Sequence, residues 1–217
     1  MRYAVLGTGM VGHTLATRLA ALGHEVRMGA REAANTKAQA WAAANGRLAG
    51  YGAYAQVSAW AERVFVAVNG ASVREVAALV GVPAVAGKVV IDVTNPLDFS
   101  RGMPPVLVPE LSGTTSGGEA LQAALPGARV VKTLNTMNHL LMVDPARVPG
   151  THDVFLCGDD AGAKDEVQGL LREFGWTSVV DLGPLSAARG TEALMPFWLR
   201  MWGVNGSADF NYRIVRA

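Results

Sequence analysis

Three glycines that follow a short apolar run most constrain what this chain can fold into. The run Arg2–Leu6 is apolar enough for a buried strand, and Gly7-Thr8-Gly9-Met10-Val11-Gly12 follows it at once. The pattern G-x-G-x-x-G between a strand and a helix is typical of a βαβ unit that binds a dinucleotide. We expect Gly7 to permit the tight turn, Gly9 to let a pyrophosphate approach the backbone, and Gly12 to let the helix pack on the strand.

The residues after the second expected strand, 24–28, indicate which dinucleotide fits. NAD-binding units usually place an Asp or Glu there for the ribose 2′-hydroxyl, whereas an Arg suits a 2′-phosphate. No acid ends this strand, and Arg31 follows it with a planar, permanently charged guanidinium. Thr8 and Lys37 can add a hydroxyl and a second positive charge. Glu32 can be read as a displaced ribose acid, but Arg31 favours NADP(H) over NAD(H).

Length and charge limit the possible partners. The 217 residues carry 19 Lys and Arg against 18 acids, a net charge of +1, so no bulk basic character is available for nucleic acid. The single cysteine, Cys157, and the lack of a signal peptide predict the cytoplasm. No apolar run approaches the roughly 18 residues of a membrane helix. Phe197, Trp198 and Trp202 suggest a homodimer through the last helix, which a monomeric mass in light scattering would discard.

Strand-like runs that alternate with helical patterns predict a doubly wound, Rossmann-like α/β fold with a mostly parallel sheet and a small C-terminal helical extension. We expect residues 1–150 to form the dinucleotide-binding domain and residues 151–217 to complete the same compact unit. The expected strands are 2–6, 24–28, 52–55, 64–68, 88–93, 129–134, 153–157 and 178–182. The expected helices after the first are 35–45, 73–80 (capped by Ser72), 119–125, 161–174 and 187–202, and 98–118 is an irregular surface loop able to move over a ligand.

Ligands of such sheets bind beyond the carboxyl ends of the strands. Three of these ends carry an asparagine, Asn69, Asn95 and Asn135, whose amide can bind a nicotinamide carboxamide or serve only as a turn residue. His139 is the one histidine near such an end and is a candidate proton donor, and Asn135 is the other candidate catalytic residue. The four histidines have no metal-like spacing. A nucleotide site without an evident acid or base suits direct hydride transfer between two bound cofactors.

Several motifs spread over nearly the whole chain together resemble one known family. They are Gly7-Thr8-Gly9, Gly23-His24-Glu25-Val26, Gly29-x-Arg31, Asn95-Pro96-Leu97, Val131-Lys132-x-x-Asn135-Thr136, Cys157-Gly158-Asp159-Asp160 and Asp181-x-Gly183-Pro184-Leu185, followed by Arg189 and Glu192. In these motifs the chain is similar to the NADPH-dependent reductases of the 5-deazaflavin coenzyme F-420. The cytosolic domain of the six-transmembrane ferric reductases is similar in the same motifs.

The resemblance implies positions for two ligands. NADP(H) would contact Gly7, Thr8, Gly9, Met10, Val11, Gly12, Arg31, Lys37, Val68 and Asn69, with its nicotinamide near Asn95, Pro96 and Leu97. A second reactant, F-420 or a flavin, would stack on the nicotinamide beside Asn135, Thr136, Met137 and the segment 203–210 with Asn205 and Gly206, and Trp202 or Met201 would line the pocket.

Three departures from the family leave the acceptor open. Ala30 stands where a serine is common, Asn69-Gly70 where many relatives have a proline and a bulky residue, and Asn135 where the deazaflavin reductases can carry a histidine. The leading hypothesis is an NADPH-dependent oxidoreductase that passes hydride to a deazaflavin or flavin. The alternatives are a reductase of a small imine or keto compound, with His139 or Lys132 as proton source, and a non-catalytic NADP(H) sensor. For Lys132 an ion-paired structural role is the simpler interpretation.

Overall fold

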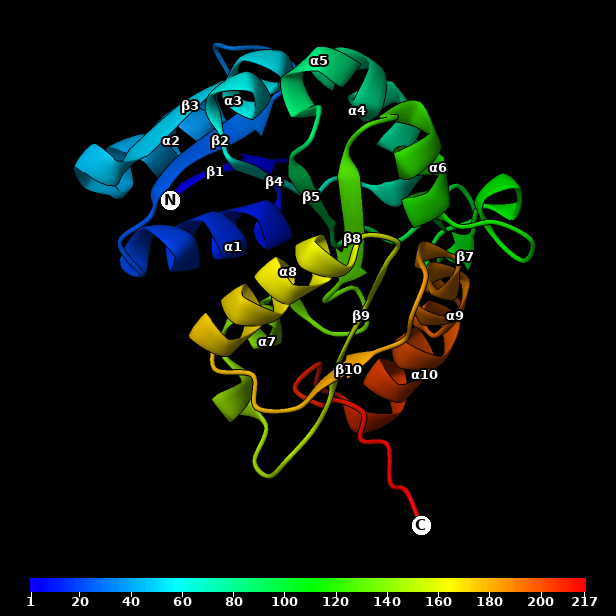
Figure 1. Cartoon of the computed structure of the whole chain (residues 1–217). Helices are drawn as coiled ribbons and strands as arrows, with labels where there is room; N and C mark the ends of the chain where they lie inside the picture. The colour runs from blue at the N-terminus through cyan, green and yellow to red at the C-terminus, as the bar shows by residue number, and fades with distance from the viewer.

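A mostly parallel sheet of eight strands forms the centre of the molecule (Figure 1). The computed structural model describes residues 1–217. The strands are β1 Arg2–Leu6, β2 Glu25–Ala30, β3 Ala49–Ala53, β4 Arg63–Val66, β5 Val89–Asp92, β8 Arg129–Thr133, β9 Val154–Gly158 and β10 Val179–Asp181. Their order is β10-β9-β8-β5-β4-β1-β2-β3, and only the β8–β9 pair is antiparallel. The predicted Rossmann-like fold class is therefore confirmed.

Helices cover both faces of the sheet (Figure 1). They are α1 Met10–Ala21, α2 Thr36–Ala44, α3 Tyr54–Trp60, α4 Val73–Val80, α5 Val82–Val85, α6 Gly117–Ala124, α7 His139–Val143, α8 Ala161–Glu173, α9 Ala188–Ala193 and α10 Met195–Asn205. Successive strand side chains point to opposite faces. Tyr3 and Val5 accordingly join a core with α1, α2, α7 and α8, whereas Ala4 and Leu6 join a core with α3 to α6. No helix is both long and apolar enough to cross a membrane.

The direction of winding reverses between β1 and β4. From β1 the chain adds β2 and β3 on one side, then returns to place β4 on the other side of β1. Loops that leave adjacent strands in opposite directions open a crevice at such a point. The glycine loop after β1 lies at this crevice, so the fold itself puts Gly7–Gly12 where a ligand can bind.

Several expected elements need correction. The strand expected at 52–55 ends at Ala53, and α3 begins at Tyr54, because the Ala53 N–H donates to the Gln56 side chain and Tyr54 and Val57 bury one helix face. The single helix expected at 187–202 is two helices, α9 and α10, and Pro196 in the first turn of α10 accounts for the interruption since proline cannot continue a helix. Ser72 precedes α4 but its side chain makes no capping bond.

The segment expected to be an irregular loop, 98–118, contains two ordered pieces. Strand β6, Leu97–Asp98, pairs antiparallel with β7, Val106–Leu107. Helix α6 begins at Gly117, two residues earlier than expected, because the Ser116 side chain accepts the Glu119 N–H. The pairing of β6 with β7 therefore forms a hairpin whose tip, residues 99–105, lies beside the crevice.

Candidate functional site

A cavity of about 750 Å³ opens at the crevice between β1 and β4. Its walls come from the glycine loop, the ends of β4 and β5, the β6–β7 hairpin, the start of α7, helix α10 and residues 207–209. Sixteen of its 26 lining residues are hydrophobic. The cavity thus joins the predicted nucleotide loop to a largely apolar chamber.

The glycine loop is shaped to approach a ligand closely. Gly7 has φ +124°, and a Cβ there would overlap the Ala67 carbonyl, while a Cβ on Gly12 would overlap the Gly7 carbonyl. A Cβ on Gly9 would meet no atom within 4 Å. Gly7 and Gly12 are therefore required by the fold, whereas the space above Gly9 is free and fits a pyrophosphate at the start of α1.

Seven of the residues predicted to bind the cofactor line this cavity. They are Gly9, Met10, Val11, Val68, Asn69, Asn95 and Leu97. Pro96 is buried behind the cavity wall, and the half-buried Thr8 lies outside the lining. Gly7 and Gly12 do not line the cavity either. Of the last two, Lys37 is exposed on α2 and Arg31 follows β2, away from the cavity lining.

Arg31 extends from the end of β2 on the surface. Its guanidinium pairs with Glu75 of α4, with Nε 3.1 Å from Oε1 and Nη2 3.3 Å from Oε2. Both side chains are more than half exposed. Exposed ion pairs contribute about 0–1 kcal/mol. A phosphate could therefore replace Glu75 as the partner of the Arg31 guanidinium at little cost in free energy. Glu32 makes no ion pair with Arg31 that would compete with the phosphate.

Asn135 and Thr136 occupy a different place from the one the sequence predicted. Both are buried and neither lines the cavity. The Asn95 amide donates to the Asn135 carbonyl at 2.8 Å, and the Asn135 amide donates to Asn95 Oδ1 at 2.9 Å. Asn135 therefore does not line the cavity but fixes the amide of Asn95, which does. Met137 lines the cavity as predicted.

The unusual Asn69-Gly70 pair has a structural reason. The Gly70 N–H donates to the Asn95 carbonyl at 3.1 Å, and a Cβ on Gly70 would overlap the Asn95 backbone. The Asn69 side chain accepts the Ala71 N–H, which is the turn role that the sequence left open. Gly70 thus lets the ends of β4 and β5 approach each other and holds the Asn95 backbone through this hydrogen bond.

His139 lies where the sequence predicted, in the cavity wall at the first turn of α7. Its Nδ1 is 2.8 Å from the Thr14 hydroxyl of α1. Burial, and then the charge of Arg147, lower the pKa of His139. The imidazole is therefore neutral at pH 7 and is held in one orientation by Thr14.

The C-terminal wall was only partly predicted. Trp202 lines the cavity, but Asn205 and Gly206 do not, because Gly206 has φ +65° and ends α10 as a left-handed cap. The chain turns back there, so Ser207, Ala208 and Asp209 form the wall instead. Met201 does not line the cavity either. A glycine after a helical run is the sequence signal that marks such a reversal.

Apolar side chains from two distant segments complete the chamber, and the sequence did not predict them as site residues. Phe99, Met103 and Pro105 come from the β6–β7 hairpin, and Met195, Trp198 and Leu199 come from α10. Trp198 stacks with Phe210 at a ring distance of 5.4 Å. Its Nε1 is buried without a hydrogen-bond partner in the protein, as is Thr94 Oγ1. Such buried polar atoms are rare unless a ligand or water completes them.

Lys132 lies behind the cavity and is fully buried. Its Nζ is 3.0 Å from Asp92 Oδ2 and 2.7 Å from Glu192 Oε1, and it donates to the Thr94 carbonyl. Burial lowers the pKa of Lys132, but the two carboxylates outweigh this effect and raise it. Burial raises the pKa of Glu192. Lys132 is therefore ion-paired, as the simpler interpretation predicts, and it does not line the cavity.

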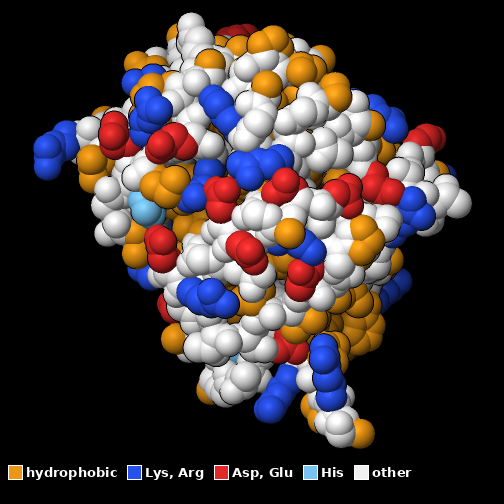
Figure 2. Space-filling model, in the orientation of Figure 1, with side chains coloured by type: hydrophobic (Ala, Val, Ile, Leu, Met, Phe, Trp, Pro, Cys, Tyr) orange, Lys and Arg blue, Asp and Glu red, His pale blue; other side chains and the backbone are white.

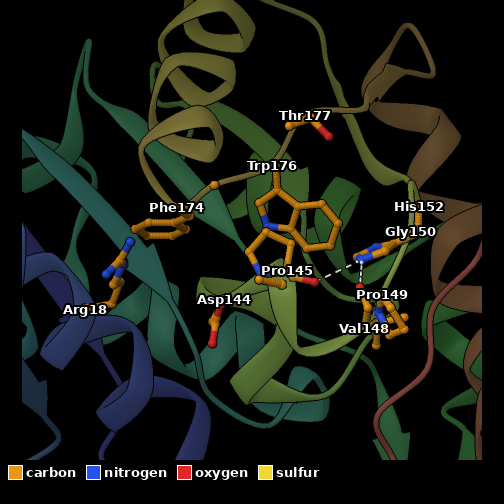
Figure 3. A pocket seen from close by; sticks show the side chains of 12 residues that line it. Arg18, Asp144, Pro145, Val148, Pro149, Gly150, His152, Phe174, Trp176 and Thr177 are labelled. Carbon is orange, nitrogen blue, oxygen red and sulfur yellow. Dashed lines mark hydrogen bonds between the residues drawn. The ribbon is translucent and has the colours of Figure 1, made fainter.

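A second cavity, of about 520 Å³, contains none of the predicted site residues (Figure 3). Trp176, Pro145 and His152 surround it, with Arg18 at one end (Figure 3). His152 Nε2 bonds the Pro145 and Val148 carbonyls at 3.0 and 3.2 Å, and Trp176 Nε1 donates to the Met142 carbonyl. These polar groups already have partners within the fold. The cavity at the glycine loop is therefore the candidate functional site.

Comparisons with known proteins identify relatives of this chain. The family model described as "NADP oxidoreductase coenzyme F420-dependent" matches residues 2–96. A crystal structure of a protein from Arthrobacter sp. FB24, named a "putative f420 dependent nadp-reductase", is 48% identical with a TM-score of 0.93, and the match covers 100% of both chains. The F420-dependent NADP reductase of Methanothermobacter marburgensis is 29% identical over 221 residues, 93% of this chain and 92% of that protein.

One further relative is much longer. Metalloreductase STEAP3 of Rattus norvegicus is 32% identical over 208 residues. The match covers 91% of this chain but only 38% of STEAP3. The chain therefore corresponds to less than two fifths of that protein's length.

Proposed function

The chain belongs to the family of coenzyme F420-dependent NADP oxidoreductases, and we propose that it transfers hydride between NADP(H) and a deazaflavin or flavin acceptor. The observation that carries the proposal is the single cavity that joins the glycine loop to an apolar chamber. A nucleotide on the loop and a flat ring in the chamber would share this one space, as direct transfer requires. When bound, NADPH supplies the hydride, and the protein supplies alignment.

Asn95 is the residue best placed to orient the nicotinamide. Its amide is held by Asn135 from behind and its backbone by Gly70. A side chain whose rotamer is locked in this way presents its remaining hydrogen-bonding capacity in one direction. Phe99, Met103 and Trp198 add apolar surface to the same cavity and would exclude water from a bound ring.

We expect Arg31→Gln to weaken NADPH binding about 10- to 100-fold, because a charge-assisted hydrogen bond contributes roughly 1.5–3 kcal/mol. NADH, which has no 2′-phosphate, should bind the variant as it binds the wild type. Calorimetric titration with both nucleotides measures the two dissociation constants. Glu75→Gln is the matched control, since it removes the pairing carboxylate and should tighten NADPH binding. An equal loss for both nucleotides would show that Arg31 does not contact the phosphate.

A small imine or keto compound is the second candidate acceptor, and the Thr14–His139 contact favours it. With the Thr14 hydroxyl donating to Nδ1, the neutral imidazole carries its proton on Nε2 and can act as a donor in the cavity. His139→Ala should then reduce imine turnover about 10²- to 10⁴-fold, the usual contribution of general acid catalysis. The discriminating experiment is NADPH oxidation followed by absorbance with F-420, FMN or a cyclic imine. A non-catalytic sensor would bind NADPH, but none of these three acceptors would cause NADPH to be oxidised.

Three further assignments are part of the proposal. Residues 151–217 complete the same unit as residues 1–150, which is supported by the pairing of β9 with β8 in one sheet. A homodimer through α10 is supported by the exposure of Phe197 and Val204 on that helix. The cytoplasm is supported by the single cysteine, Cys157, which is buried and free.

A further inference from the structure

The cavity contains one pair of opposite charges. Arg147 is the only Lys or Arg among its lining residues, and Asp209 is the only acid. Arg147 Nη2 lies 3.0 Å from Asp209 Oδ2, and the two side chains are 35% and 40% exposed. The otherwise apolar chamber therefore has a single cationic position, and the chain's own carboxylate occupies it.

Asp209 belongs to a short segment after α10, residues 207–209, which we call the strap and which forms part of the cavity wall. The strap is tied to Asn138, whose Nδ2 donates to the Ala208 carbonyl at 2.6 Å and to Asp209 Oδ1 at 3.0 Å. Asn138 Oδ1 in turn accepts the N–H groups of Leu140 and Leu141 at the start of α7. Asn138 is thus fixed to the helix, whereas the Asp209 carboxylate is fixed only by partly exposed bonds.

We propose that Arg147 binds an anionic group of the second reactant, a phosphate ester or carboxylate, in place of Asp209. This inference rests on the proposed function, because it assigns the polar end of the acceptor whose ring fills the chamber. A partly exposed ion pair contributes about 0–1 kcal/mol, so its replacement costs little. Guanidinium binds phosphate or carboxylate oxygens with two parallel hydrogen bonds, which the single short contact to Asp209 Oδ2 does not provide.

The test compares two flavins that differ only in a phosphate. FMN and riboflavin are titrated into the NADP⁺-saturated protein, and flavin fluorescence gives both dissociation constants. The wild type should bind FMN about three- to ten-fold more tightly than riboflavin. Arg147→Gln should remove this preference, Arg147→Lys should keep part of it, and Asp209→Asn should increase it because the competing carboxylate is gone. Arg172→Gln, an exposed arginine of α8 outside the cavity, is the matched control and should change neither constant.

An unchanged FMN preference in Arg147→Gln would overturn the inference, as would equal weakening of both flavins by Asp209→Asn. Failure of both flavins to bind would also overturn it. Failure of the proposed function is a separate result, because it would appear as flavin binding with the predicted preferences but no oxidation of NADPH by FMN or F-420. A thermal unfolding scan of each variant confirms that the compared proteins are folded.

Discussion

Gly9→Ala is expected to weaken NADPH binding about 10- to 100-fold and to leave the free energy of unfolding nearly unchanged. In the free protein the added methyl group meets no atom within 4 Å, and the backbone of Gly9 at φ −82° is allowed for any residue. The same methyl group would occupy the space that a pyrophosphate needs above the start of α1, and overpacking of this kind costs about 1–3 kcal/mol. Calorimetry with NADPH and denaturant unfolding measure the two quantities.

Gly12→Ala provides the opposite pattern in the same loop. Its Cβ would overlap the Gly7 carbonyl even without a ligand, so this variant should lose stability as well as binding. Wild-type affinity in a folded Gly9→Ala variant would mean that the nucleotide does not approach this loop. A loss of stability in Gly9→Ala would mean that the space above Gly9 is needed by the protein itself. The two variants thus distinguish a glycine that ligand binding needs from a glycine that the folded protein itself needs.

Local patterns in the sequence predict much of the cavity wall around the glycine loop. Strand β1, the glycine loop and Arg31 follow one another within thirty-one residues, so spacing along the chain is nearly spacing in the fold. The alternation of Tyr3 and Val5 with Ala4 and Leu6 also requires helices on both faces. Helix α3 was missed because its seven residues are too few for a clear period, and its start depends on the Gln56 cap.

The acceptor half depends on contacts between segments that are remote in the sequence. Phe99 and Trp198 share one chamber although ninety-nine residues separate them, and no period or motif relates them. Asn135 illustrates a second limit. Its residue type suits a ligand, but a partner forty residues away, Asn95, decides that the side chain is buried. Arg147 was overlooked because a lone arginine after a short helix carries no signal until the chain returns with Asp209.

Lys132→Met is expected to reduce the free energy of unfolding by about 3–5 kcal/mol, because removal of one member of a buried ion pair leaves charge without a partner. Both Asp92 and Glu192 would then be buried with no cation nearby. Lys164→Met is the matched control, since the Lys164–Asp181 pair is partly exposed and should cost at most about 1 kcal/mol. Urea unfolding at pH 7 gives the difference. A similarly small loss of stability in both variants would mean that charge pairing does not stabilise the cluster of Lys132, Asp92 and Glu192.

The pH dependence of the stability loss in Lys132→Met identifies the carboxyl group that causes it. Burial raises the pKa of Glu192, and in Lys132→Met the lysine charge that opposes this shift is absent. A carboxyl whose folded pKa lies above its unfolded value contributes stability at low pH and loses that contribution as pH rises through the folded pKa. The deficit of Lys132→Met relative to wild type should therefore be larger at pH 8 than at pH 5. Lys132→Met with Glu192→Gln should remove most of this pH dependence, because glutamine keeps the shape of the side chain without a titrating proton. A deficit that is constant from pH 5 to 8 in the single variant would assign the loss to packing of the lysine stem.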